Sequence, residues 1–254
     1  MLCPTRELAD QVATEIRRLA RAQDNIKVVT VYGGVPSRGQ IASLENGAHI
    51  VVGTPGRVMD LMERGALDIS NLKTLVLDEA DRMLDMGFLA DIETVVRQCP
   101  PERQTLLFSA TYPEGIAGLA QRFMRQPEMV KVAAQHSAHK ISQRWYEVGA
   151  REKRATVALL LAHFRPESTI AFCNTKQQCR DLVADLQAQG FSALALFGEL
   201  EQRERDEVLV QFANRSCSVL VATDVAARGL DIANLSAVVN VDVTPDPEVH
   251  IHRI

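Results

Sequence analysis

Residues 74–88 read T-L-V-L-D-E-A-D-R-M-L-D-M-G-F, a short apolar run followed at once by acids. The first four residues are β-branched or apolar, which is enough for one buried strand. Asp78, Glu79 and Asp81 come directly after it. Acids that follow a buried strand lie at the carboxyl edge of a sheet, where open α/β sheets bind ligands. We therefore expect a functional site at this edge.

The acids of this stretch allow two interpretations. Neighbouring residues of an extended chain point to opposite sides, so Asp78 and Glu79 have different roles. One acid can hold a hard cation such as Mg²⁺ while the other polarises a water molecule. Alternatively, the acids only mark a helix N-terminus, where the macrodipole favours negative charge. The four residues alone do not separate these interpretations, and motifs elsewhere must decide.

The composition is that of an ordinary globular protein and sets limits on its partners. The 254 residues allow two domains of usual size, with 46% hydrophobic and 24% charged residues. The net charge of -4 excludes a protein that coats nucleic acid through overall charge, so any nucleic-acid site is a local groove. Five cysteines without a C-x-x-C pair indicate reduced thiols in a cytoplasmic protein. No apolar run reaches the ~18 residues of a membrane span.

The first half of the chain alternates between strand patterns and helix patterns. Strands are predicted at residues 27–32, 50–52, 74–77 and 105–108, and residues 1–4 read as the end of another strand. Each strand ends in a short polar or glycine motif, and a helical stretch follows. This alternation predicts a parallel sheet with crossover helices, with the motifs at one edge.

The second half repeats the alternation after a predicted linker at residues 135–140. His136 and His139 lie in this linker, and no acid or cysteine lies nearby at the spacing of metal ligands. We therefore do not expect a metal site there. Residues 141–148 are predicted to be an entry strand, with Trp145 in the core. Further strands are expected at residues 169–173, 191–197, 219–221 and 237–241. The fold class is therefore α/β, with lobes at residues 1–134 and 141–254.

An ordered set of motifs resembles the DEAD-box RNA helicases over almost the whole chain. Single motifs of this kind are weak signals, but nine in order at strand ends are specific. The amino-acid sequences of several of these stretches are most similar to those of the bacterial DbpA subgroup. The resemblance implies two RecA-like lobes, each a mostly parallel sheet with helices on both faces, the first of them incomplete. The motifs are P-T-R-E-L-A, G-G, T-P-G-R, D-E-A-D, S-A-T, F-C-N-T, E-Q-R-E-R, A-T-D-V-A-A-R-G-L-D and H-R-I.

The resemblance implies an enzyme that uses ATP and Mg²⁺. Asp78 would organise Mg²⁺ on the phosphates through bound water, and Glu79 would position and activate the attacking water. Asp81 would connect this site to Ser109 and Thr111. The residues implied in catalysis are Asp78, Glu79, Asp81, Ser109 and Thr111. The residues implied in nucleotide binding are Asp78, Asp231 and Arg253.

The resemblance also implies an RNA-binding edge on both lobes. Hydroxyls, backbone amides and a few arginines suit the sugar-phosphate chain and its 2′-OH, and they carry no base code. Such an edge needs no basic protein, which agrees with the net charge. The implied residues of the first lobe are Pro4, Thr5, Arg6, Gly34, Thr54, Gly56 and Arg57. Those of the second lobe are Thr175, Gln202, Arg205, Thr223 and Gly229, with Arg228 nearby.

The chain departs from the family pattern at several points. No G-K dipeptide occurs, so the phosphate-binding loop G-x-x-x-x-G-K is absent, and the G-R-x-x-R that supplies the arginine finger is missing after Arg253. Phe197 stands where many relatives have histidine. We therefore expect that the natural protein is longer at both ends. We also expect that this 254-residue fragment hydrolyses ATP poorly or not at all by itself. The resemblance to the DbpA subgroup also implies a C-terminal domain that targets ribosomal RNA, which these 254 residues do not include.

Three functions remain open from the sequence. The first is an ATP-dependent RNA helicase, with ribosome assembly as its process and a monomeric state. The second is a non-catalytic RNA clamp without a phosphate-binding loop. The third is a DNA translocase of the wider superfamily. This function is disfavoured because the motifs P-T-R-E-L-A, T-P-G-R and D-E-A-D are much more similar to those of the RNA enzymes.

Overall fold

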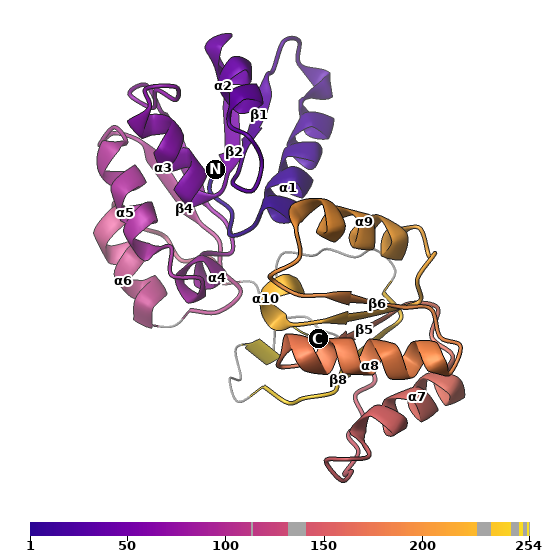
Figure 1. Cartoon of the computed structure of the whole chain (residues 1–254). Coiled ribbons are helices and arrows are strands. Elements are labelled where there is room, and N and C mark those ends of the chain that lie inside the picture. Colours follow the sequence, from indigo (N-terminus) through magenta and orange to yellow (C-terminus); the bar gives the residue numbers. More distant parts are fainter. Residues whose placement is uncertain (113, 132–140, 228–234, 245–248, 251–252, 254) are drawn as a thin grey trace. The chain divides into compact units, whose positions relative to one another are not determined.

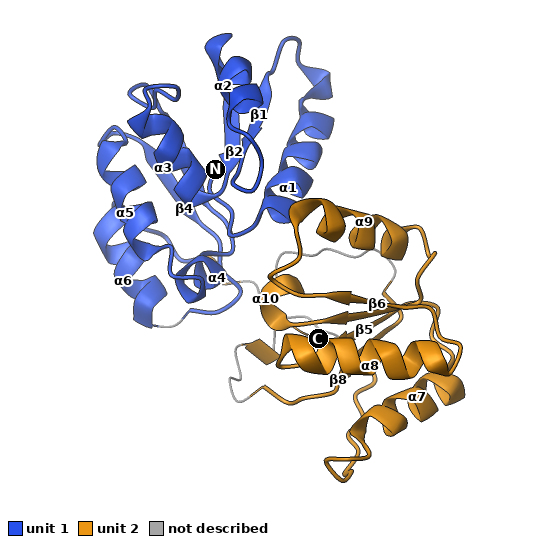
Figure 2. Ribbon diagram, viewed as in Figure 1, with its two compact units in different colours: residues 1–129 blue, residues 130–254 orange. Residues whose placement is uncertain are grey.

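A computed structural model describes residues 1–112, 114–131, 141–227, 235–244, 249–250 and 253 (Figure 1). The chain divides into two compact units, Met1–Met129 and Val130–Ile254 (Figure 2). The predicted linker at residues 135–140 lies outside the described residues. Each unit is an α/β body with its own core.

The sheet of the first unit consists of two parallel strand pairs joined by the start of the chain. β1 (Val28–Val31) pairs with β2 (Ile50–Gly53), and β3 (Thr74–Leu77) pairs with β4 (Gln104–Leu107). Leu2 bridges the two pairs, because its N–H donates to Val76 O (2.8 Å) and it forms parallel bridges with Gly53 and Leu77. This confirms the strand character predicted for residues 1–4.

Helices cover both faces of this sheet because successive strand residues point to opposite sides. Val28 packs with Ala9 and Ala13 of α1, whereas Val29 packs in a larger cluster with Leu61 of α3. The helices of the unit are α1 (Arg6–Leu19), η1 (Ala20–Ala22), α2 (Arg38–Glu45), α3 (Pro55–Glu63), α4 (Ala80–Asp85), α5 (Leu89–Gln98) and α6 (Glu114–Phe123). A helical stretch was predicted after each strand, and after β3 the structure has two helices, α4 and α5.

The second unit has a four-stranded parallel sheet in the order β6-β7-β5-β8. The central strands β5 (Thr169–Phe172) and β7 (Val219–Ala222) are buried along their whole length. The edge strands are β6 (Ala193–Leu196) and β8 (Ala237–Asn240). An all-parallel sheet is stable when both of its faces are covered, which predicts continuous apolar strands such as these.

Alternate residues of β5 define the two faces of the second sheet. Ala171 packs with Leu161 and Leu182 on one face, and Ile170 packs with Phe212 on the other. Figure 1 shows the helices on both sides of the strands. They are α7 (Lys153–Phe164), α8 (Lys176–Ala188), α9 (Gln202–Ala213) and α10 (Asp224–Ala227). The predicted α/β class with helices on both faces is therefore confirmed.

The prediction for residues 141–148 was wrong. This segment forms no strand, and Trp145 is 85% exposed. A strand needs a neighbour for its N–H and C=O groups. Within the described residues, none of the named strands pairs with this segment, so its backbone has no neighbouring strand with which to form β-ladder hydrogen bonds. Arg144 instead stacks on the ring of Phe164, with the guanidinium carbon 5.0 Å from the ring centroid.

Candidate functional site

The acids that follow β3 lie at the carboxyl edge of the first sheet. The N–H of Asp78 donates to Leu2 O (3.0 Å), and the N–H of Ala80 donates to Phe108 O (3.0 Å), directly after β4. These two bonds hold the acidic turn between the start of the chain and the neighbouring strand end. The edge position expected from the sequence is therefore observed.

Glu79 has a backbone conformation that is unusual for its residue type. Its φ of 48° and ψ of 53° lie in the left-handed region, which costs about 1–3 kcal/mol for a residue other than glycine. This strained residue immediately precedes α4, and its carboxylate pairs with Arg82 at 3.3 Å. Such strain concentrates at functional sites. Arg82 was not predicted as a site residue, although its spacing of three residues from Glu79 is that of a helical ion pair.

Asp81 joins the acidic turn to the S-A-T motif. Asp81 is 2% exposed, and its carboxylate accepts from the N–H (2.8 Å) and the hydroxyl (2.7 Å) of Thr111. Its own N–H donates to the hydroxyl of Ser109 (3.3 Å). A buried carboxylate with several donors is strongly held, because hydrogen bonds to a charged group are stronger than neutral ones. The structure thus brings together three residues that the sequence separates by about thirty positions.

Burial raises the pKa of two carboxyl groups at this edge. For Asp78 burial is the main cause, and the Glu79 N–H that donates to it (3.0 Å) acts in the opposite direction. For Glu79 burial again dominates, and the charge of Arg82 opposes it. Titratable groups with raised pKa values beside one another are typical of sites that bind cations or move protons.

The raised pKa of Asp78 predicts a pH-dependent effect of D78N on stability. The folded chain binds this proton more tightly than the unfolded chain, so the wild type loses stability as the pH rises between the two pKa values. Asparagine does not ionise and keeps an oxygen for the Glu79 N–H. We expect D78N to unfold at a higher temperature than the wild type at neutral pH. The difference in unfolding temperature between D78N and the wild type should decrease as the pH falls toward about 4, the usual pKa of aspartate.

Thermal unfolding of D68N is the matched control for this experiment. The N–H of Ser70 donates to Asp68 and lowers its pKa, so its ionisation stabilises the folded chain above the unfolded pKa. D68N should therefore be less stable than the wild type at neutral pH, and this deficit should shrink at acidic pH. A pH-independent difference between D78N and the wild type would contradict the assigned cause.

Other predicted residues of the first unit follow its strands at the same edge. Thr5 caps α1 by accepting from the Leu8 N–H (3.3 Å), and Thr54 precedes α3 and donates its N–H to Val31 O (3.0 Å). Pro4 is buried beside Thr5. Gly34 follows β1 with a φ of 77°, which glycine adopts without strain. These residues lie at the same sheet edge as the acidic turn, because the parallel strands all end on this side.

The predicted arginines and Gly56 of the first unit lie among other side chains. Arg57 donates to Gln40 Oε1 (3.1 Å) and to Val35 O (3.0 Å). The guanidinium carbon of Arg6 lies 5.0 Å from the ring centroid of Tyr32. A Cβ at Gly56 would be 3.5 Å from a carboxylate oxygen of Asp91. The neighbours of the arginines, Gln40 and Tyr32, were not identified from the sequence because they come from other elements.

Predicted residues of the second unit gather at the carboxyl edge of its own sheet. Thr175 follows β5 and caps α8 in a capping box with Gln178. Thr223 follows β7, and its carbonyl accepts from the Ala226 N–H (3.0 Å). Gln202 and Arg205 lie on α9, and Arg205 donates to the carbonyl of Ala226.

Arg253 is the remaining predicted residue of the second unit that the structure describes. Arg228, Gly229 and Asp231 lie outside the described residues. Arg253 is buried (4% exposed) and makes an ion pair with Asp224, the first residue of α10. Asp224 was not among the residues predicted from the sequence.

Metal and thiol chemistry has few candidate groups in the described part of the chain. No cluster of three or more His, Cys, Asp or Glu side chains there could hold a metal ion by itself. All five cysteines are buried and free, as expected for reduced thiols. None of the described helices is both long and apolar enough to cross a membrane.

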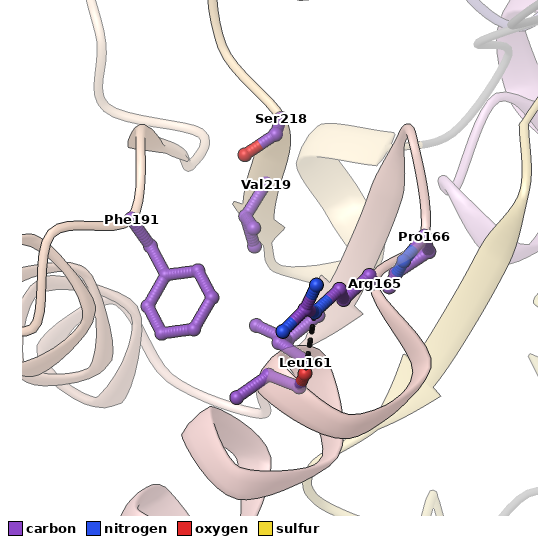
Figure 3. A pocket seen from close by; sticks show the side chains of 7 residues that line it. Leu161, Arg165, Pro166, Phe191, Ser218 and Val219 are labelled. Carbon is purple, nitrogen blue, oxygen red and sulfur yellow. Dashed lines mark hydrogen bonds between the residues drawn. The ribbon is translucent and has the colours of Figure 1, made fainter.

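A pocket of about 320 Å³ lies at the opposite edge of the second sheet (Figure 3). Leu161, Arg165 and Phe191 line it, together with Ser218 and Val219 at the start of β7. The amino ends of the strands form this edge, and none of the predicted site residues lines the pocket. The pocket is therefore separate from the candidate site.

Comparisons with known proteins agree with this arrangement. A family model described as DEAD/DEAH box helicase matches residues 1–119, and one described as helicase conserved C-terminal domain matches residues 152–254. The ATP-dependent RNA helicase DbpA of Escherichia coli is 52% identical over the whole chain, which covers 56% of that relative. The DEAD-box ATP-dependent RNA helicase CshA of Streptococcus pneumoniae is 47% identical, with 48% covered. The chain spans about half the length of these curated relatives.

Solved structures show the same relationship. A DEAD box protein from Methanococcus jannaschii is 41% identical with a TM-score of 0.51, and the match covers 100% of this chain and 68% of that one. Dbp5 of S. cerevisiae bound to RNA and ADP BeF3 is 29% identical with a TM-score of 0.80, and the match covers 99% of this chain and 66% of that one. With both helicase domains matched and the motifs at the expected strand ends, the chain belongs to the DEAD-box helicase family.

Proposed function

We propose that the protein is an ATP-dependent RNA helicase, with the two lobes separated near residues 135–140. The observation that carries the proposal is the bonding of buried Asp81 to Thr111 and Ser109, next to the strained Glu79. This arrangement ties a candidate catalytic acid to a second strand end, so a change at one can move the other. The names of the relatives, ATP-dependent RNA helicases, support the same assignment.

The residues of the acidic edge take separate roles in this proposal. Mg²⁺ is usually bound by one or two carboxylates together with substrate phosphates, so a single half-buried Asp78 fits a magnesium ion carried with ATP. When bound, the ion neutralises charge that develops on the phosphates. Glu79 orients the attacking water and accepts its proton. Arg82 holds the Glu79 carboxylate in place. Asp231 acts on the nucleotide from the second lobe.

RNA binds along the polar edges of both units. Thr5, Thr54, Thr175 and Thr223 offer hydroxyls and helix starts to the sugar-phosphate chain. Such groups recognise the backbone and the 2′-OH and do not read bases. The other RNA-contacting residues in this proposal are Pro4, Arg6, Gly34, Gly56, Arg57, Gln202, Arg205 and Gly229. The proposal includes ribosomal RNA as the target, ribosome assembly in the cytoplasm as the process, and action as a monomer, as the resemblance of the sequence motifs to the DbpA subgroup implies.

A non-catalytic RNA clamp is the second candidate. The observation in its favour is that these 254 residues contain no G-K dipeptide and hence no phosphate-binding loop. The acidic edge argues for the enzyme, because a clamp has no use for a strained, half-buried carboxylate at Glu79.

The ATPase test compares the 254-residue chain with a longer protein that adds the G-x-x-x-x-G-K loop and the G-R-x-x-R sequence. We expect little turnover from the chain alone, since a missing arginine finger by itself costs ~10³-fold or more in related enzymes. The longer protein should hydrolyse ATP faster when single-stranded RNA is added. Equal stimulation by DNA would favour a translocase. RNA binding without turnover in the longer protein would favour the clamp.

A further inference from the structure

The guanidinium of Arg253 makes hydrogen bonds that account for all of its donors. It has five N–H groups in a planar fork. Nε and Nη2 donate to the two carboxylate oxygens of Asp224, the second at 2.6 Å. Nη1 donates to Asn240 Oδ1 (3.1 Å) and to Asp242 O (2.7 Å), and Nη2 also donates to Asn174 Oδ1 (3.4 Å). In this conformation no donor is left for a phosphate.

The surroundings of Arg253 hold it firmly. Its side chain is buried, and the guanidinium carbon lies 5.0 Å from the ring centroid of Phe172, the last residue of β5. A cation over an aromatic face is attracted by the ring quadrupole. The bidentate pair with Asp224 adds directional bonds to that attraction.

The acceptors of Arg253 come from the ends of three strands. Asn174 follows β5, Asp224 follows β7, and Asn240 ends β8. In the sheet order, β7 and β8 flank β5 on its two sides. One side chain therefore connects the carboxyl ends of three neighbouring strands. Asp242 extends the network, because it accepts from Lys153 of α7 (2.8 Å) and from the Asn174 N–H (3.3 Å).

We propose that Arg253 is a positioning residue for the RNA-binding edge of the second unit. Asn174 immediately precedes Thr175, and Asp224 immediately follows Thr223, so Arg253 sets the spacing of the two threonines. A preorganised edge binds its ligand more tightly because less ordering free energy is spent on binding. The inference rests on the proposed RNA function, and it replaces the expected nucleotide contact of Arg253.

Arginine is required for this role because of its shape. Lysine carries a positive charge but only three donors on one nitrogen, so it cannot form the bidentate pair with Asp224 and also reach the ends of β5 and β8. R253K therefore separates the geometry of the fork from its charge.

The experiment measures single-stranded RNA affinity of the 254-residue chain without nucleotide, by fluorescence anisotropy. We expect R253K to bind a labelled RNA about tenfold more weakly than the wild type, because the two threonines lose their fixed spacing. A residue that only contacted nucleotide would leave this affinity unchanged. Chemical denaturation of each variant establishes that the protein is folded under the binding conditions.

L161A is the matched control for lost stability. Leu161 is buried in the same unit, but it lines the pocket at the amino edge of the sheet. We expect L161A to be destabilised and still bind RNA with the wild-type affinity. If R253K does not fold, N240A removes one neutral acceptor and keeps the Asp224 pair, and it should also weaken RNA binding.

Three results would overturn the inference. Wild-type RNA affinity in folded R253K, or in folded N240A where R253K does not fold, would show that the spacing does not depend on Arg253. Equal loss of affinity in L161A and R253K would assign the effect to stability alone. Absence of RNA binding by the wild type would count against the RNA function of this edge, and with it against the role of Arg253.

Discussion

Replacing Glu79 by glutamine is expected to lower ATP turnover by about 100-fold or more in a protein that also carries the phosphate-binding loop, the range for loss of a general base. Glutamine has the size of glutamate and keeps an oxygen for Arg82, which lies 3.3 Å from the carboxylate. It cannot accept a proton from water. RNA affinity should stay near that of the wild type, because Glu79 has no part in the proposed RNA edge. Steady-state ATPase and RNA-binding assays measure the two effects.

E93Q is the matched control for this variant. Glu93 is also an ion-paired glutamate of the first unit, with Arg97 at 3.4 Å and Arg122 at 2.6 Å, but it lies on α5. Its replacement removes the same charge and should leave turnover within a fewfold of the wild type. If E79Q turned over ATP at a near-normal rate, Glu79 could not be the catalytic base.

Replacing Asp81 by alanine is expected to lower the free energy of unfolding by about 2–3 kcal/mol, the upper range for hydrogen bonds to a charged group. The change leaves the N–H and hydroxyl of Thr111 without their carboxylate acceptor. The Arg82 N–H loses an acceptor as well. Chemical denaturation followed by circular dichroism measures the loss. Turnover in the longer protein should fall too, because the acidic turn is no longer connected to the S-A-T motif.

D85A provides the comparison within the same helix. Asp85 is the last residue of α4 and is exposed. Exposed substitutions usually change stability by less than about 0.5 kcal/mol. A D81A variant as stable as D85A would show that the bonds to Thr111 contribute nothing to folding.

The sequence by itself determined the α/β class and the position of the acidic edge. Thr74–Leu77 was predicted to be a strand and is β3 with the same bounds, because a short apolar run bounded by acids is a local signal. A polar motif followed by a helix was predicted after each strand, and Thr5 and Thr175 in two such motifs cap α1 and α8. Motif order was informative because parallel strands all end on one edge, so residues far apart in sequence had to gather there.

Only the tertiary structure decided which side chains hold this edge in place. The bond between Asp81 and Thr111 spans 30 residues, and the contact of Arg253 with Asn174 spans 79. The left-handed backbone of Glu79 and the exposure of Trp145 also have no local signal. A strand pattern depends on neighbouring residues, whereas the partner of a buried charge or the exposure of an apolar ring depends on which distant segments pack beside it. Arg253 illustrates this point. Its motif implied a contact with the nucleotide, but in the structure all of its N–H groups donate to other residues of the protein.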